Sequence, residues 1–182
     1  MERLVRTVVL ACGLCILPLS GMLAQQSLDR FTIGSSVGVE ENPPIGVNAE
    51  YSIGAHFGIG ALIHYQQYTI PFGYVEAQNQ KVEWYVSAVY HLDRIASLDP
   101  YIALRAGSRI LYSSIKPTAL GIAAGLQEEE PGTFRKTNVH AAIGTRYEVT
   151  PVFSLHGFMD VHIVGDGQSR DVDVMIGWDF IL

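Results

Sequence analysis

The residues of this chain that are best suited to chemistry are its histidines, arginines and carboxylates, and most of them fall at alternate positions in the sequence. A histidine beside a carboxylate can transfer a proton or bind a cation, whereas an arginine beside a carboxylate forms a lasting ion pair. The residues concerned are Glu50, His64, Glu83, Arg105, Arg109, His140, Arg146, Glu148, His156, Asp160, His162, Asp173 and Asp179. These residue types favour a charge-paired network with a structural role. The functional alternative is a narrow path for protons or small ions, or a cation site.

The spacing of these residues does not indicate a metal site, since no histidine and carboxylate spacing here matches a ligand pattern. The chain has two cysteines, Cys12 and Cys15, and both lie in an N-terminal segment that we expect to be removed. We therefore predict no metal, no cofactor and no disulfide in the mature chain.

The C-terminal stretch best indicates which elements position these residues. Apolar side chains occupy every second position from Val172 to Leu182, and Asp173 and Asp179 lie between them. Because successive side chains of a strand point to opposite faces, this pattern predicts a strand with one apolar and one polar face. A strand that crosses a bilayer needs roughly 9–11 residues, and this stretch is long enough.

The same alternation recurs along the chain, and no helical period of useful length appears after the N-terminal segment. The expected strands cover residues 31–39, 45–53, 57–66, 82–92, 102–110, 138–149, 153–163 and 172–182. We expect long connections at about 67–81 and 113–137. Eight expected strands without a helix predict an all-β fold. Because eight is an even number, the strands suit an eight-stranded antiparallel up-and-down transmembrane β-barrel.

Alternation alone does not say which face of the barrel is inside, but the charged residues do. The apolar face of every expected strand lacks charged residues and histidine, as lipid requires, because one Lys or Arg at the bilayer midplane costs roughly 2–4 kcal/mol. The lysines, Lys81, Lys116 and Lys136, all fall in expected connections, whereas a solvated strand face would normally carry lysines. We therefore expect the polar face inside and the apolar face in lipid, rather than a soluble barrel with an apolar interior.

Aromatic residues on the apolar face are expected at the two membrane interfaces. If the first strand starts on the periplasmic side, most of them fall near that rim and a smaller group nearer the other. The first group is Phe31, Tyr51, Phe57, Tyr90, Tyr147, Phe153 and Phe180, the second is Tyr65, Trp84 and Tyr112, and Trp178 belongs to the same lipid-interface set.

The N-terminal segment indicates that the protein is exported. Arg3 and Arg6 precede an apolar segment from Val8 to Leu19 and a small-residue exit near Ala24, so we predict a signal peptide over residues 1–24 and a barrel domain over 25–182. Without the signal, 10 of the 12 basic and 17 of the 18 acidic residues remain, a net charge of about −7. No basic patch is left for a nucleic-acid partner.

The mature chain resembles the small eight-stranded outer-membrane β-barrels, the class that includes the OmpA transmembrane domain and OmpX. The resemblance rests on the alternating pattern, the length, and the terminus, which has Phe180 two residues before the end. It implies location in the outer membrane of a Gram-negative-type cell, insertion by the barrel-assembly machinery, contact with outer-membrane lipids and lipopolysaccharide, and a monomer. The expected role is structural or surface interaction, with a plugged polar lumen and external loops.

The resemblance also leaves open a narrow ion or small-solute channel and a lipid A-modifying acyl-transfer enzyme. Ser154 and His156 share a face, with Asp160 and Glu148 within reach. The order of Ser and His is the reverse of that in the deacylase of the family, and both residues are expected to face the lumen rather than the lipid. We therefore predict no catalytic residue and no enzyme.

The expected connection at 113–137 holds two further features. Ala119 to Leu126 is an apolar patch that either folds onto a partner or the rim, or forms a short loop helix. Glu128 to Glu130 is an acidic run that either binds divalent cations or is simply solvated.

Overall fold

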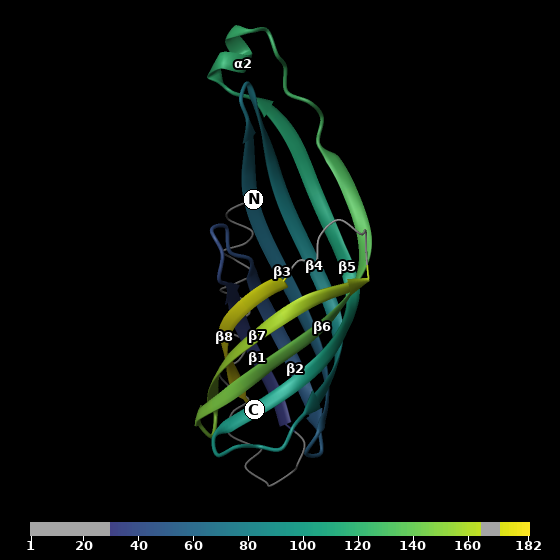
Figure 1. Cartoon of the computed structure of the whole chain (residues 1–182), viewed down its shortest axis with the longest axis vertical. Coiled ribbons are helices and arrows are strands. Elements are labelled where there is room, and N and C mark those ends of the chain that lie inside the picture. The colour runs from purple at the N-terminus through teal and green to yellow at the C-terminus, as the bar shows by residue number, and fades with distance from the viewer. Residues whose placement is uncertain (1–29, 165–171) are drawn as a thin grey trace.

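The computed structural model describes residues 30–164 and 172–182 and is a single closed barrel (Figure 1). Each strand pairs antiparallel with its neighbours in sequence, and β8 closes the ring against β1. The elements are β1 (Arg30–Gly38), β2 (Ile45–Ile53), β3 (Phe57–Phe72), β4 (Val75–His91), β5 (Leu98–Pro117), α2 (Ala119–Ala123), β6 (Gly132–Thr150), β7 (Phe153–Val164) and β8 (Val172–Ile181). Among the described helices, none is long and apolar enough to cross a membrane.

The predicted fold class is confirmed: the barrel is all-β, eight-stranded, antiparallel and up-and-down. Several strand limits agree with the alternation, most closely in β2 (Ile45–Ile53) and in β8, which ends at Ile181. The predicted signal peptide over 1–24 lies outside the described residues.

The long connection expected at about 67–81 is wrong, and the one expected at about 113–137 is present but shorter. β3 continues to Phe72 and β4 begins at Val75, so that only a tight turn through Gly73, which has a positive φ of 69°, joins them. In the same way β5 reaches Pro117 and β6 begins at Gly132. At these strand ends the apolar residues change to the opposite face, so the pattern that marks a membrane-spanning strand does not continue into them.

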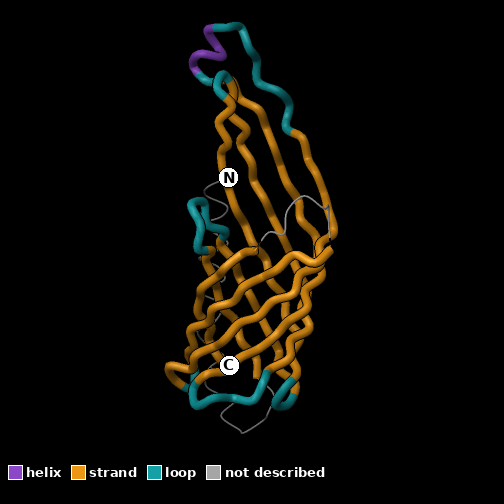
Figure 2. Tube along the Cα trace, in the orientation of Figure 1, coloured by secondary structure: helices purple, strands orange, loops and turns teal. Residues whose placement is uncertain are grey.

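The prolonged strands form a sheet that extends beyond the barrel (Figure 2). β2 begins opposite Tyr65 of β3, and β7 ends opposite Val139 of β6, so the strand parts beyond these residues have no partner from β2 or β7. We call this region the extended sheet, and it comprises residues 66–72 of β3, 75–81 of β4, 111–117 of β5 and 132–138 of β6. The opposite end of the barrel, where β1 begins and β8 ends, is the terminal rim.

The polarity of the outward face changes where the extended sheet begins. Along β4 the outward residues Val86, Trp84 and Val82 are followed by Gln80, Gln78 and Glu76. The neighbouring strands change in the same way: the outward positions of the extended sheet on β3, β5 and β6 are Gln67, Thr69, Pro71, Tyr112, Ser114, Lys116, Thr133, Arg135 and Thr137. The prediction that the lysines fall in connections is therefore also wrong, because all three lie in strands. The charged residues on the outward face lie beyond the apolar band.

The helix α2 caps the tip of the extended sheet. The Thr118 hydroxyl accepts a hydrogen bond from the Gly121 amide and so caps the helix, while the Thr118 amide donates to the Tyr74 carbonyl at 2.9 Å. Gly121 lies so close to the β3–β4 turn that an added Cβ would be 2.1 Å from the Tyr74 oxygen. Of the two interpretations of the 119–126 patch, the structure supports a short loop helix.

Closure of the barrel depends on a glycine at the β1–β8 seam, which leads to the first prediction. A Cβ on Gly34 would lie 2.1 Å from the Trp178 carbonyl oxygen and 2.2 Å from an Asp179 carboxylate oxygen. We expect Gly34→Ala to destabilise the folded barrel by about 1–3 kcal/mol, because one added methyl group forces the seam apart. The measurement is the urea midpoint of the heat-modifiable band on a gel run without boiling.

Gly157→Ala is the matched control for this substitution, since the nearest atom to its new methyl group is 3.8 Å away. If Gly34→Ala and Gly157→Ala unfold at the same urea concentration, close packing at the seam does not limit closure.

Candidate functional site in the barrel interior

The interior of the barrel contains two polar clusters with apolar side chains between them. The strands place alternate residues inside, so each cluster draws side chains from strands that are far apart in the sequence. The terminal cluster lies toward the terminal rim, and the distal cluster lies toward the extended sheet.

Asp179 is the centre of one half of the terminal cluster, and its side chain is fully buried. It accepts hydrogen bonds from Asn48 Nδ2 at 2.7 Å and from Arg146 Nε at 3.0 Å. His156 Nδ1 lies 2.8 Å from the same carboxylate. A buried carboxylate with three polar partners is satisfied, and such an arrangement holds the strands in register.

Arg146 links Asp179 to the other half of the terminal cluster. Its Nη2 donates to Glu50 Oε2 at 3.2 Å, and its Nη1 lies 3.7 Å from Asp99 Oδ2. His91 lies between the same two carboxylates, 2.7 Å from Glu50 Oε1 and 3.0 Å from Asp99 Oδ1. Three buried carboxylates thus surround one guanidinium and two imidazole rings.

The distal cluster is built on two arginines of β5. Arg105 forms an ion pair with Asp160, and its guanidinium lies 4.3 Å from the centre of the Phe158 ring. Arg109 Nε donates to Glu83 Oε1 at 2.5 Å, and Lys81 Nζ lies 3.5 Å from the other oxygen of Glu83.

Histidine and tyrosine rings complete the distal cluster. Tyr85 Oη lies 3.2 Å from His140 Nε2, and the rings of His140 and His162 are 5.0 Å apart. His64 contacts the edge of Tyr85 at 6.4 Å between ring centres. In the described part of the chain no group of three or more His, Cys, Asp and Glu residues is arranged to hold a metal ion.

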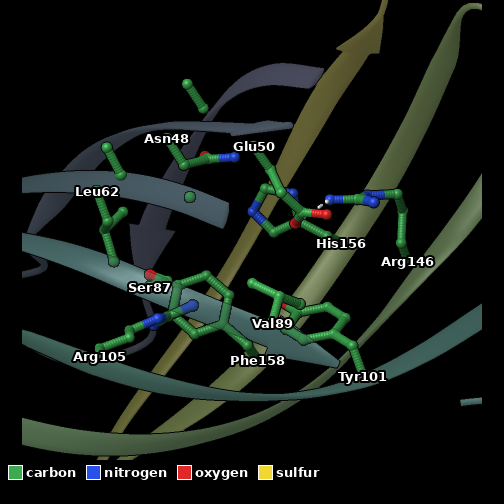
Figure 3. Close-up of a pocket in the computed structure, with 13 residues that line it drawn as sticks. Asn48, Glu50, Leu62, Ser87, Val89, Tyr101, Arg105, Arg146, His156 and Phe158 are labelled. Carbon is green, nitrogen blue, oxygen red and sulfur yellow. Dashed lines mark hydrogen bonds and ion pairs between the residues drawn. The ribbon is translucent and has the colours of Figure 1, made fainter. Parts of the chain in front are cut away.

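Apolar side chains separate the two clusters. Leu62, Val89 and Phe158 are buried, and together with Arg105 and Arg146 they line a cavity of about 40 Å³. Figure 3 shows Arg105 lying across the Phe158 ring at this level. A cavity of this size holds one or a few water molecules, which is much less than a continuous aqueous path requires.

A larger cavity of about 580 Å³ opens at the terminal rim, among the described residues. Glu148 lies on its wall and binds two arginines through one oxygen, Arg30 at 2.6 Å and Arg94 at 2.9 Å. Glu148 therefore lies at the rim, and its position differs from that of the deep lumen residues with which the sequence analysis grouped it.

The structure brings most of the predicted polar residues together inside the barrel. The buried ones are Glu50, His64, Glu83, Arg105, His140, Arg146, His156, Asp160 and Asp179, and the half-buried ones are Arg109, Glu148, His162 and Asp173.

The sequence analysis missed Asp99, because it began the fifth strand at residue 102, whereas β5 begins at Leu98. Asp99 does have the same parity as Arg105, which was the available signal. The analysis also missed the inward apolar residues Leu62, Val89 and Phe158, since it expected a purely polar interior.

The predicted interface aromatics all lie on the outward face. Those that are exposed are Phe31, Tyr51, Phe57, Trp84, Tyr90, Tyr112, Tyr147, Trp178 and Phe180, and those that are half-buried are Tyr65 and Phe153. Tyr112 pairs with Gln80, one outward row beyond Tyr65, so it belongs to the extended sheet.

Ser154 and His156, the pair considered for acyl transfer, are both buried inside the barrel. Nδ1 of His156 is directed at Asp179, and neither the Ser154 hydroxyl nor His156 Nε2 has a hydrogen-bond partner among the described residues. The serine and the histidine therefore do not form the hydrogen bond that activates a nucleophile.

Comparison with known proteins finds matches among solved structures only. No family model matches the chain, and no curated protein matches it. A major outer membrane protein from Thermus thermophilus has a TM-score of 0.64 at 9% identity, over 85% of this chain and 99% of that one. The N-terminal β-barrel domain of OprF from Pseudomonas aeruginosa has a TM-score of 0.55 at 15% identity, over 84% and 97%. Ail, the attachment invasion locus protein of Yersinia pestis, has a TM-score of 0.54 at 11% identity, over 85% and 97%.

At these identities the likeness concerns the fold. It confirms the expected resemblance in architecture to small eight-stranded barrels, and each compared chain is covered almost completely.

Proposed function

Because the chain has the fold of the small outer-membrane β-barrels, we propose that it is an exported, integral outer-membrane protein with a structural or surface-interaction role. In this proposal the terminal rim faces the periplasm, and the extended sheet with α2 stands outside the cell. The protein acts through its architecture rather than by catalysis. Its partners are outer-membrane lipids and lipopolysaccharide, and the barrel-assembly machinery during insertion.

The observation that carries this proposal is the change of polarity on the outward face. An apolar band such as that around Val86 suits hydrocarbon, and the polar positions beyond Val82 suit water. A barrel that ended at the membrane would not need strands as long as β4 and β5. The extended sheet therefore supports a role in contacts outside the membrane.

The extended sheet offers two edges for such contacts. Residues 66–72 of β3 and 132–138 of β6 each pair with a single neighbouring strand among the described residues. An edge of this kind can bind a strand of another protein through its backbone groups. A surface role is favoured over a channel because the interior contains paired charges, and the cavity between the two clusters has a volume of about 40 Å³.

The orientation is tested with single cysteines, because both native cysteines fall in the predicted signal peptide. We expect a membrane-impermeant maleimide to label Ser114→Cys on intact cells, whereas Ala55→Cys, in the turn at the terminal rim, reacts only after the outer membrane is permeabilised. Labelling of Ala55→Cys alone on intact cells would reverse the proposed orientation, and labelling of neither after permeabilisation would contradict the outer-membrane location.

The two alternatives from the sequence have direct tests. Purified barrel in a planar bilayer is expected to show no discrete conductance steps, and reproducible steps would support a channel. Lipid A from cells with and without the protein is expected to have the same acylation pattern by mass spectrometry, and a changed pattern would support an acyl-transfer enzyme.

A further inference from the structure

The inner face of the extended sheet carries more hydrophobic side chains than the inner face of the barrel below it. Strand parity is continuous across the boundary, because the pairing of β3, β4, β5 and β6 has no register shift there. The face that carries His64, Glu83 and Arg109 inside the barrel continues into a set of mainly hydrophobic residues, and the polar residues Asn79 and Ser113 lie in one row across it. We call the hydrophobic residues the inner apolar face, and they are Tyr68, Ile70, Phe72, Val75, Ala77, Leu111, Ile115 and Phe134.

Much of the inner apolar face is open to solvent. Phe72 is 61% exposed, Phe134 is 56% exposed and Ile70 is 41% exposed. The β1–β2 loop covers the barrel mouth only as far as Gln66, whose Nε2 donates to the Asn42 carbonyl at 2.7 Å. Beyond that point no second layer of described residues lies over the sheet (Figure 2). Since the outward side of the same sheet is polar, the apolar side is not explained by burial in a bilayer.

Cationic side chains lie directly below the inner apolar face. Lys81 pairs in register with Leu111, which in turn pairs with Phe134, so Lys81 lies in the lowest row of this face. The next row down contains Glu83, Arg109 and Lys136. The strands supply three cations and one carboxylate in these two rows, and the β1–β2 loop adds the carboxylate of Glu40, which accepts a hydrogen bond from Gln66 at 3.0 Å. The side chain of Lys136 is exposed.

The size of the inner apolar face limits what it can bind. Four strands spaced about 4.8 Å apart, each with seven residues at about 3.3 Å, give an area of roughly 400 Å². A stable protein–protein interface buries about 800 Å² on each partner. The area is therefore small for a protein partner, and it suits a single extended hydrocarbon chain.

We propose that the inner apolar face binds a long-chain carboxylate taken up from the external medium. The alkyl chain lies along Ile70, Ile115 and Phe134, and the carboxylate lies between Lys81 and Lys136, which are in adjacent rows. This inference rests on the proposed function, because it requires the extended sheet to stand in water outside the cell. It adds a ligand class to the surface role.

The test uses the full barrel in nanodiscs with ¹³C-methyl isoleucine, titrated with dodecanoate. We expect the Ile70 and Ile115 methyl resonances to shift and saturate, whereas Ile59 and Ile102, on the lipid face of the barrel, follow only the slight partitioning of dodecanoate into lipid. Uncharged dodecanol is expected to bind more weakly, and dodecyltrimethylammonium more weakly still. Equal shifts with the cationic and anionic amphiphiles would overturn the proposal, as would shifts confined to Ile59 and Ile102.

Matched variants distinguish the residues that contact the alkyl chain from those that contact the carboxylate. Ile70→Asp is expected to weaken dodecanoate binding more than tenfold, and Thr69→Asp, on the opposite face of the same strand, is expected to leave it nearly unchanged. Lys136→Gln is expected to weaken dodecanoate about two- to fivefold without affecting dodecanol. Heat-modifiable migration shows whether each variant is folded, and wild-type affinity in folded Ile70→Asp would overturn the proposal.

The labelling of Ser114→Cys on intact cells distinguishes a failure of the ligand proposal from a failure of the proposed function. If Ser114→Cys is labelled and the isoleucine methyls do not respond to dodecanoate, only the ligand proposal fails. If Ser114→Cys is not labelled although the barrel is in the outer membrane, the proposed function fails, whatever the titration shows.

Discussion

Replacing Arg146 with methionine is expected to lower the free energy of unfolding of the barrel by about 3–5 kcal/mol. Arg146 is 6% exposed and is the only guanidinium described as contacting Glu50, Asp99 and Asp179 together. Its removal leaves Glu50 and Asp179 with His91 and His156 as their described basic partners, and Asp99 with His91 and the half-exposed Arg94. An uncompensated buried charge costs far more than a lost surface ion pair, because the interior solvates it poorly.

The measurement is urea unfolding of the barrel in lipid vesicles, followed by tryptophan fluorescence. Arg30→Met is the matched control, since the Arg30 side chain is 42% exposed and pairs with Glu148 at the rim. An exposed ion pair of this kind contributes at most about 1 kcal/mol. A loss no greater in Arg146→Met than in Arg30→Met would mean that the terminal cluster does not hold the barrel together.

A second large effect is expected from Val86→Arg, which should cost about 2–4 kcal/mol in a bilayer. Val86 is 53% exposed on the outward face of β4 and pairs with Ala61 and Ala106, midway between Tyr90 and Val82 on the apolar band of this strand. An arginine here must carry its charge into hydrocarbon, or distort the bilayer in order to hydrate it.

Gln80→Arg is the control for this substitution, because Gln80 lies on the same strand and the same parity but beyond the apolar band. It is expected to change the free energy of unfolding by less than about 0.5 kcal/mol. Both variants are compared by urea unfolding in vesicles. Equal stability of the two variants would mean that the outward face of the barrel does not meet lipid.

The sequence by itself determined the spanning part of the barrel. Between the two rims one face of each strand needs to be apolar for lipid and the other is largely polar, so period-two alternation is strong in segments such as Ile45–Ile53 and Val172–Ile181. It predicted the outward aromatics and the inward set centred on Arg146 and Asp179, because these follow directly from strand parity.

Only the tertiary structure revealed the strand ends and the inward residues that the pattern of polar and apolar residues does not indicate. Residues 67–81 were expected to be a connection because they are rich in Gln, Asn and Gly, yet hydrogen bonds to neighbouring strands hold them as the ends of β3 and β4. Asp99 joins the terminal cluster through the start of β5, and Phe158 lies inside because parity, not hydrophobicity, sets its direction.

The physical reason is that alternation reflects the solvent on each side of a strand, whereas pairing depends on neighbours that are distant in the sequence. Where one side of the strand is lipid, the two kinds of information agree. Beyond the apolar band they separate, and the extended sheet and its inner apolar face are visible only once β3, β4, β5 and β6 are paired.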